Sequence, residues 1–176
     1  MTLPAPLDDI DRRLLQELQQ DCKTPLSKLG DRVGLGAPAV MDRLRKLESA
    51  GVITGYRAVV DSRRVGLDIT AFIGVSINYP KDIEQFLAQV AERAEVLECH
   101  HVTGEHTLLL KVKTENTASL ERVISALRRV EGVTRTESMI VLSTSAETSQ
   151  VPLPEPHAAS DAPSKRRSGR ETRRAS

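Results

Sequence analysis

Residues 24–55, TPLSKLGDRVGLGAPAVMDRLRKLESAGVITG, decide how the N-terminal part of the chain folds. The stretch reads as two short helices joined by a Gly-Leu-Gly turn. The Thr24 hydroxyl can cap the first helix, Pro25 suits its first position, and apolar residues follow at helical spacing. Gly34 occupies the place of a left-handed C-cap residue, and Gly36 can cap the next helix. The pattern predicts a helix-turn-helix, a motif that enters the DNA major groove.

The second helix is predicted from Ala37 to about Ala50 and is closed by Gly51. Its valine and two leucines fall on one face, at about 100° per residue, and anchor it to its domain. The opposite face carries arginine and lysine, which suit base edges and phosphates. A merely solvated charged face is the alternative, and the compact capped pair of helices favours DNA. The candidate DNA contacts are Ala37, Pro38, Ala39, Asp42, Arg43, Arg45 and Lys46.

The amino-acid composition places only broad limits on the partners and the cellular location of the protein. The chain has 176 residues and a net charge of +1, so total charge does not indicate nucleic acid. Cys22 and Cys99 fall in different domains and form no framework of pairs, so we expect free thiols in a reducing cytoplasm. The sequence has no apolar run of membrane-spanning length and no signal-peptide pattern. We expect a soluble cytoplasmic protein without a membrane partner.

Residues 8–20 complete a three-helix head, and the pattern changes after residue 66. Residues 70–78 alternate as a strand, and two long helical stripes and three further strands follow. The order βαββαβ predicts a ferredoxin-like sandwich, so the fold class is α+β. The expected domains are a helix-turn-helix domain at 1–60, a linker at 61–66, a ferredoxin-like domain at 67–145, and a disordered Pro/Ser/Arg-rich basic tail at 146–176.

Apolar residues on both faces of the predicted sheet indicate self-association. Two helices cover one face only, yet Phe72, Leu109, Met139 and Val141 alternate toward the other face. A second copy is the simplest cover for this open face. A two-fold dimer would also present two recognition helices to two half-sites of double-stranded DNA.

Four segments together resemble the Lrp/AsnC (leucine-responsive/asparagine regulator) family of prokaryotic transcription factors. They are LDDIDRRLLQELQQD, LGDRVGL with PAVMDRLRKLESAGVITGYRAVVD, VTGEHTLLLKV and GVTRTESMIVLS, which stand in family order over residues 7–143. The resemblance implies an N-terminal helix-turn-helix and a C-terminal effector-sensing domain. It also implies homodimers that assemble further, often into octamers, and small effectors, usually amino acids, bound between subunits.

The chain departs from the family pattern in a loop of the second domain. The family commonly has Gly-x-Tyr-Asp there, and its Asp helps to shape the effector pocket. This chain reads Gly104-Glu105-His106-Thr107, which removes that partner for an ammonium group; Glu105 can substitute, or the effector is unusual or absent. By position, the candidate effector-binding residues are Gly104, Glu105, His106, Thr107, Thr136 and Ser138.

A metal site and a cofactor are not expected. Strand alternation lets at most Cys99, His101 and His106 converge, whereas a structural zinc ion prefers four ligands. We also find no catalytic triad, phosphate loop or pair of carboxylates, so we do not expect an enzyme. Two alternatives to an effector-responsive regulator stay open. One is an architectural protein that bends DNA without a ligand, and the other is a siroheme decarboxylase, a class of similar layout.

Overall fold

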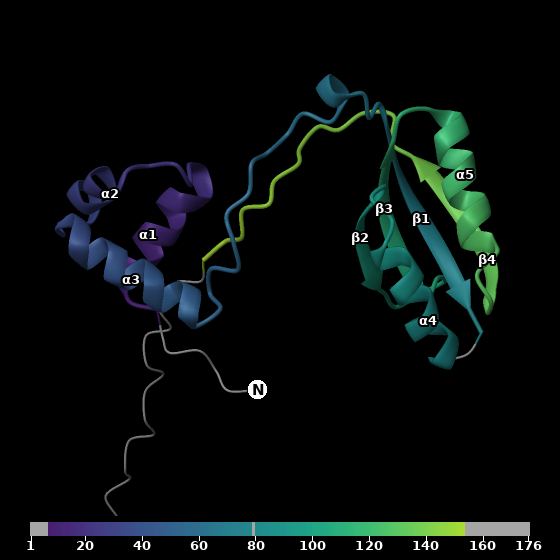
Figure 1. Ribbon diagram of the computed structural model, residues 1–176, viewed down its shortest axis with the longest axis horizontal. Coiled ribbons are helices and arrows are strands. Elements are labelled where there is room, and N and C mark those ends of the chain that lie inside the picture. Colours follow the sequence, from purple (N-terminus) through teal and green to yellow (C-terminus); the bar gives the residue numbers. More distant parts are fainter. Residues whose placement is uncertain (1–6, 79, 154–176) are drawn as a thin grey trace, which may run out of the picture. The chain divides into compact units, whose positions relative to one another are not determined.

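The computed structural model describes residues 7–78 and 80–153 (Figure 1). The chain forms two compact units. The head unit contains the N-terminal residues up to Arg57 together with the segment that starts at Thr148. The sheet unit runs from Ala58 to Glu147. Among the described residues, no helix is long and apolar enough to cross a membrane.

Three helices form the head unit: α1 (Asp9–Gln20), α2 (Leu26–Val33) and α3 (Ala37–Ser49). A capping box starts α1, since the Asp8 carboxylate accepts from the Asp11 backbone N–H at 2.8 Å and Asp11 reaches back. The three helices bury one apolar cluster, as their sequence stripes predict. Its buried members are Leu14, Leu15, Leu29, Val40, Leu44 and Leu47.

The turn between α2 and α3 depends on glycine. Gly34 adopts a left-handed conformation with φ of 72°, which is the predicted C-cap. Gly30 lies against the turn itself, because a Cβ atom there would be 2.3 Å from the Leu35 carbonyl oxygen. The predicted Thr24 cap is wrong: α2 begins one residue later, and its N-cap, Pro25, has no side-chain acceptor.

The segment that follows α3 contains no strand. Val52 and Ile53 pack against the head core instead, and Val59 is 95% exposed. A short 3-10 helix, Arg63–Val65, then leads into the sheet unit.

The sheet unit has the predicted βαββαβ order. Its four strands are antiparallel and lie in the order β2-β3-β1-β4, so β1 is paired on both sides. Ile73 of β1 faces Leu110 on one neighbour and Ser138 on the other. The elements are β1 (Ile69–Ile77), α4 (Pro80–Ala91), β2 (Val96–His101), β3 (Leu108–Thr114), α5 (Thr117–Arg128) and β4 (Val133–Ile140).

Helices α4 and α5 cover one face of this sheet. Alternate residues of β1 and β3, such as Ile73 and Leu110, are fully buried against Phe86 of α4 and Leu127 of α5. The other face, which we call the open face, carries the intervening residues. Phe72 pairs with Met139 there, and Met139 is 48% exposed. The sequence pattern therefore placed the two faces of β1 correctly.

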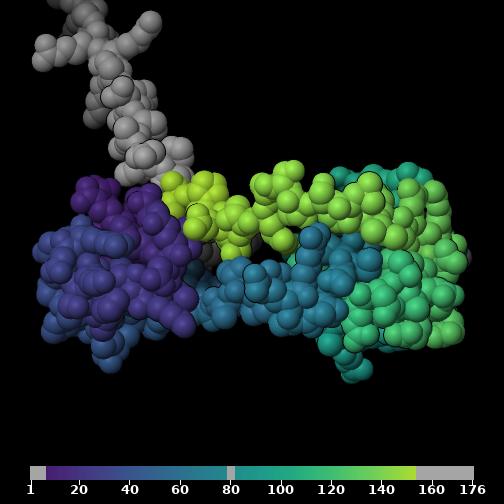
Figure 2. Space-filling view, turned by 90° about the horizontal axis from the view of Figure 1, so that it is seen from above, coloured from purple at the N-terminus to yellow at the C-terminus, as the bar shows by residue number. Residues whose placement is uncertain are grey.

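The chain ends differently from the expectation of a disordered tail from residue 146. Residues 148–153 belong to the head unit, and Leu153 packs against its apolar cluster. Figure 2 shows this last described stretch, in yellow-green, against the purple atoms of the N-terminal residues. The predicted tail beyond residue 153 lies outside the described residues.

Candidate functional site

The exposed face of α3 is the first candidate site. Val40, Leu44 and Leu47 are buried, whereas Pro38, Ala39, Asp42, Arg45 and Lys46 are exposed and Ala37 is half-buried. The side chains of Arg45 and Asp42 are 69% and 70% exposed, and their charged groups lie 3.8 Å apart. This weak contact leaves the guanidinium accessible, because exposed ion pairs contribute little. Arg45 and Lys46 therefore form a basic surface that a phosphate or a base edge can reach.

Arg43 lies at the flank of α3 and is already engaged. Its Nη1 contacts Asp8 at 2.6 Å and Asp11 at 2.8 Å, so it joins α3 to the start of α1. The pKa of the Asp8 carboxyl is lowered, first by its hydrogen bond from the Asp11 backbone and then by the Arg43 guanidinium. Both carboxylates in turn raise the pKa of Arg43. The structure thus gives Arg43 a fastening role within the head, whereas Arg45 has only the weak contact with Asp42.

The end of α3 is tied to the chain that leaves it. The Tyr56 hydroxyl donates to the Glu48 carboxylate at 2.9 Å. Burial, followed by this bond, raises the pKa of Tyr56 to about 12, so its hydroxyl keeps its proton. The contact ties the chain that leaves α3 to the last turns of that helix.

A second candidate site lies on the open face of the sheet, where His106 packs over Gly74. A Cβ atom at Gly74 would lie 2.3 Å from the His106 ring, so only glycine leaves room for the imidazole. The His106 side chain is 15% exposed. Its Nδ1 atom is buried and has no hydrogen-bond partner among the described residues. Most buried polar atoms in folded proteins have a hydrogen-bond partner, so this atom marks the place as a candidate for a bound ligand or water.

Charged groups of both signs surround this histidine. Glu137 Oε2 lies 3.7 Å from His106 Nε2. Arg135 bridges the two carboxylates, with Nη1 at 2.5 Å from Glu105 and Nη2 at 2.8 Å from Glu137. We call Glu105, His106, Arg135 and Glu137 the charged cluster. It can offer a cation-binding pair of carboxylates and an anion-binding guanidinium within one site.

The other predicted effector residues take different positions. Thr107 Oγ1 accepts from the Ile77 backbone N–H at 3.1 Å, which fastens the loop to β1. Gly104 is exposed and gives the loop its turn, with φ of 117°. Thr136 and Ser138 lie on the opposite face from Glu137, and Arg128 of α5 donates to Thr136 at 2.7 Å. The structure brings Glu105 and His106 together but leaves Thr136 and Ser138 away from them.

Arg135 and Glu137 were missed by the sequence prediction. The signal was present, because Met139 was correctly placed on the open face and residues two and four positions earlier must share it. The prediction followed the hydroxyl side chains of β4 instead, and these face α5.

The charged cluster also bears on metal binding. Ligand atoms of Glu105, His106 and Glu137 lie within 4.8 Å of one another, a different set from the cysteine and histidines considered from the sequence. The Arg135 guanidinium already occupies the space between the two carboxylates. A second cation would have to displace it, so the arrangement suits an organic ligand with both charges better than a metal ion.

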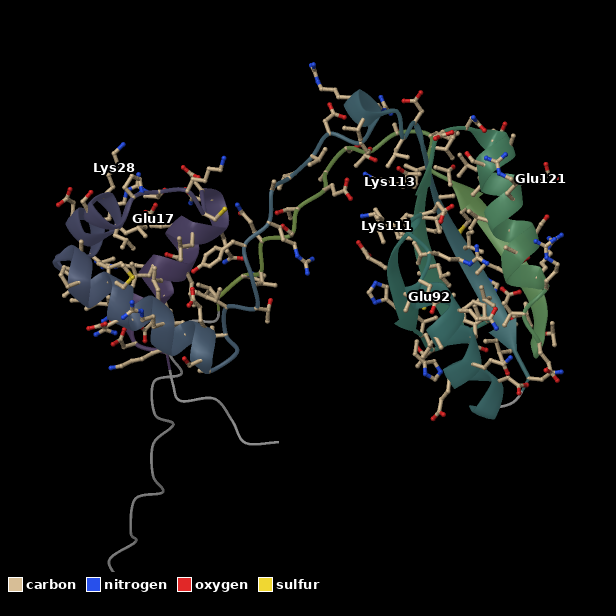
Figure 3. The ribbon with its side chains drawn as sticks, viewed as in Figure 1. Glu17, Lys28, Glu92, Lys111, Lys113 and Glu121 are labelled. Atoms are coloured by element: carbon tan, nitrogen blue, oxygen red, sulfur yellow. The ribbon has the colours of Figure 1, made fainter. Side chains whose placement is uncertain are left out.

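The rest of the open face carries an ion network beside its apolar residues. Lys111 of β3 contacts Glu98 at 3.2 Å and also contacts Glu147, and it projects to the same side of β3 as Lys113 (Figure 3). The pKa of Glu98 is lowered by His100 and then by Lys111. Cys99 lies on the other face, where burial raises the pKa of its thiol. The open face is therefore partly apolar and partly charged, as protein–protein interfaces usually are.

Two family models match the chain. An AsnC-type helix-turn-helix domain matches residues 7–48, and an Lrp/AsnC ligand-binding domain matches residues 70–151. Together they span most of the chain and coincide with the head helices and the sheet unit.

Individual relatives agree over nearly their whole length. The leucine-responsive regulatory protein of Rhizobium meliloti is 36% identical over 87% of this chain and 100% of its own. The crystal structure of a Neisseria meningitidis transcriptional regulator in complex with L-methionine has a TM-score of 0.80 and 33% identity, over 84% of this chain and 97% of that one. A feast or famine regulatory protein from Mycobacterium tuberculosis, also complexed with L-methionine, has a TM-score of 0.78 and 36% identity, over 83% and 99%.

Proposed function

This chain belongs to the Lrp/AsnC family of DNA-binding transcriptional regulators, and we propose that α3 reads the major groove while the charged cluster receives an amino-acid effector. The exposed basic face of α3 carries the first part of the proposal. Ala37, Pro38, Ala39, Asp42, Arg45 and Lys46 form the contact surface, and Arg43 positions it. Membership of a family of regulators leaves no support for the decarboxylase alternative.

In this proposal two copies of the chain form a homodimer, and each copy presents its head to the DNA. The open face offers Phe72, Leu109 and Met139 around charged groups, and a second copy is its proposed cover. A two-fold dimer reads two half-sites, as helix-turn-helix proteins do. Further assembly of dimers, up to an octamer, and action in the cytoplasm are parts of the same proposal.

The effector part rests on complementary charge. An α-amino acid carries an ammonium and a carboxylate group, and the charged cluster carries carboxylates and a guanidinium. We place the ligand's carboxylate on Arg135 and its ammonium on Glu137, where the ammonium takes the place of the Arg135 guanidinium on that carboxylate. Glu137 thereby supplies the negative charge that Thr107 lacks. Two relatives with L-methionine in their structures support the class of ligand.

Binding-site selection from random DNA, repeated with each of the twenty amino acids, tests the function. We expect one enriched motif with two half-sites, and a footprint or affinity that at least one amino acid changes. An enriched motif that no amino acid affects would favour the architectural alternative. Failure to enrich any motif would contradict the regulator proposal for this head.

Titration of the effector tests the charged cluster. Glu137→Gln should weaken effector binding at least tenfold, because one charged hydrogen bond contributes about 1.5–3 kcal/mol. Glu121→Gln is the matched control, since Glu121 is exposed on α5 (Figure 3). If both variants bind the effector with equal affinity, the proposed contact between the ammonium group and Glu137 is wrong. Isothermal titration calorimetry with L-methionine as first probe gives these affinities.

A further inference from the structure

The C-terminal end of α1 is a docking surface for another part of the same chain. Residues 150–153, which we call the strap, run against it. The Val151 backbone N–H donates to Gln19 Oε1 at 2.6 Å, and Gln19 Nε2 donates back to the Val151 carbonyl at 3.2 Å. Gln150 Nε2 donates to the Gln19 backbone carbonyl at 3.0 Å. Helix C-terminal carbonyls lack partners within the helix, so Gln150 satisfies a group that would otherwise need water.

An apolar contact accompanies these hydrogen bonds. Leu153 is half-buried and packs against the apolar cluster of the head. Val151, whose side chain is 65% exposed, contributes through its backbone. The Gln19 side-chain amide thus bonds both backbone groups of Val151, and Leu153 adds an apolar anchor, so the strap is held by polar and apolar contacts together.

The strap changes how the head is attached. The chain leaves the head unit at Arg57 and returns to it at Thr148, so two connections join the two units. On the second connection, Glu147 forms an ion pair with Lys111 of β3. Only Thr148 and Ser149 separate this residue in sequence from the first residue of the strap.

We propose that the strap is a second fastening of the head, which limits its rotation and pre-arranges the two heads of a dimer for two half-sites. This inference rests on the proposed function, because it concerns how the head is presented to DNA. A domain held by one connection loses more freedom when it binds than a domain held by two. The benefit appears only when both heads bind one duplex, since intramolecular binding depends on the effective concentration of the second head.

The test uses the full chain with the strap released. Gln19→Ala and Gln150→Ala together remove the three hydrogen bonds, and Leu153→Ala, combined with them, removes the apolar anchor. Leu142→Ala is the matched control, because Leu142 lies on the same connection and is 93% exposed. Amide hydrogen exchange must show lost protection at residues 150–153 while the α1 core around Leu14 stays protected. Truncation after Glu147 gives a second, independent release.

Head rotation is measured first, without DNA. A dye at position 28 (Lys28→Cys, with Cys22→Ser and Cys99→Ala) reports the head, since Lys28 is exposed and points away from α2 (Figure 3). We expect fluorescence anisotropy to gain a faster decay component of large amplitude when the strap is released, and Leu142→Ala to leave the decay unchanged. An unchanged decay with a demonstrably released strap would overturn the proposal, whether or not the chain binds DNA specifically.

DNA binding then separates fastening from folding. Release of the strap should weaken binding to the selected duplex, which has two half-sites, about tenfold. When one half-site of this duplex is scrambled, release should weaken binding less than about twofold. Equal losses on both duplexes would mean that the strap only supports the fold of the head, and this would also overturn the proposal. Loss of specific binding by the wild-type chain would instead contradict the proposed function, while the anisotropy result would still stand.

Discussion

At the scale of single residues, the head uses its arginines in different ways. Arg43 is bound to two carboxylates at the start of α1, and Arg32 pairs with Glu17. Arg45 has only a weak contact at 3.8 Å and a side chain that is 69% exposed. A guanidinium that already contacts carboxylates must give up these contacts before it binds a phosphate or a guanine, so its net binding free energy is smaller. Arg45 is therefore the arginine of α3 that we expect to read DNA.

Arg45→Ala should weaken binding to the selected DNA by about 1–3 kcal/mol. If Arg45 contacts a base, the variant should accept other bases at one position of the selected motif. If Arg45 contacts a phosphate, the variant should bind all sequences more weakly by the same factor. Electrophoretic mobility shifts on the motif and its single-base variants distinguish the two. Arg13→Ala, at an exposed position of α1, is the control for loss of charge, and an equal effect there would contradict a specific role for Arg45.

Asp8 makes the stability of the head depend on pH. Its pKa is lower than the ordinary 3.8 in the folded chain, so its ionised form favours folding. This contribution is complete above the unfolded pKa and is lost as the pH falls below 3.8 through the folded pKa. Asp8→Asn should therefore lower Tm by a constant amount above about pH 5, and the difference should shrink toward pH 3. Asp9→Asn, which leaves the bond between Asp8 and Arg43 intact, is the control in the same thermal melts, and an equal trend in both variants would contradict the role of Asp8.

At the scale of elements, the turn of the helix-turn-helix sets the angle of α3. Gly30 and Gly36 flank this turn but meet different surroundings. A Cβ atom at Gly30 would be 2.3 Å from a backbone oxygen, whereas the nearest atom to one at Gly36 is 3.7 Å away. Backbone cannot move aside as a flexible side chain can, so the two glycines should differ in tolerance.

Gly30→Ala should lower the free energy of unfolding by about 1–3 kcal/mol, because the turn must open to admit the methyl group. Gly36→Ala should cost less than about 1 kcal/mol, since alanine is only a poorer N-cap. Urea denaturation followed by circular dichroism gives both values. Similar costs for the two variants would show that the close approach at Gly30 does not limit stability.

The sequence predicted the elements better than the sites between them. The faces of α3 and β1 follow from periods of 3.6 and 2, which the chain displays locally. The charged cluster joins a loop residue, His106, to Glu137 on β4, and this depends on strand order and register that no local pattern encodes. The strap was missed for a related reason: Gln150 and Leu153 have no periodicity, and their partner Gln19 lies at the other end of the sequence.

At the scale of the whole molecule, the open face should govern assembly. Met139→Glu places a charge beside Phe72 on that face and should reduce the proposed dimer to a monomer. Leu87→Glu, at a similarly exposed position on α4, should retain at least the dimer. Light scattering coupled to size-exclusion chromatography measures both masses. A dimer that survives Met139→Glu with unchanged stability would mean that two copies meet elsewhere.

Since the strap belongs to the head unit, the order of synthesis on the ribosome matters for this chain. The three head helices emerge first and can fold early. Leu153 and the glutamine that covers the end of α1 follow only after the whole sheet unit has been made. The DNA reader of a nascent chain is thus incomplete until the residues that follow the sheet unit have been made, and a product terminated before them would carry α3 without the second attachment of the head.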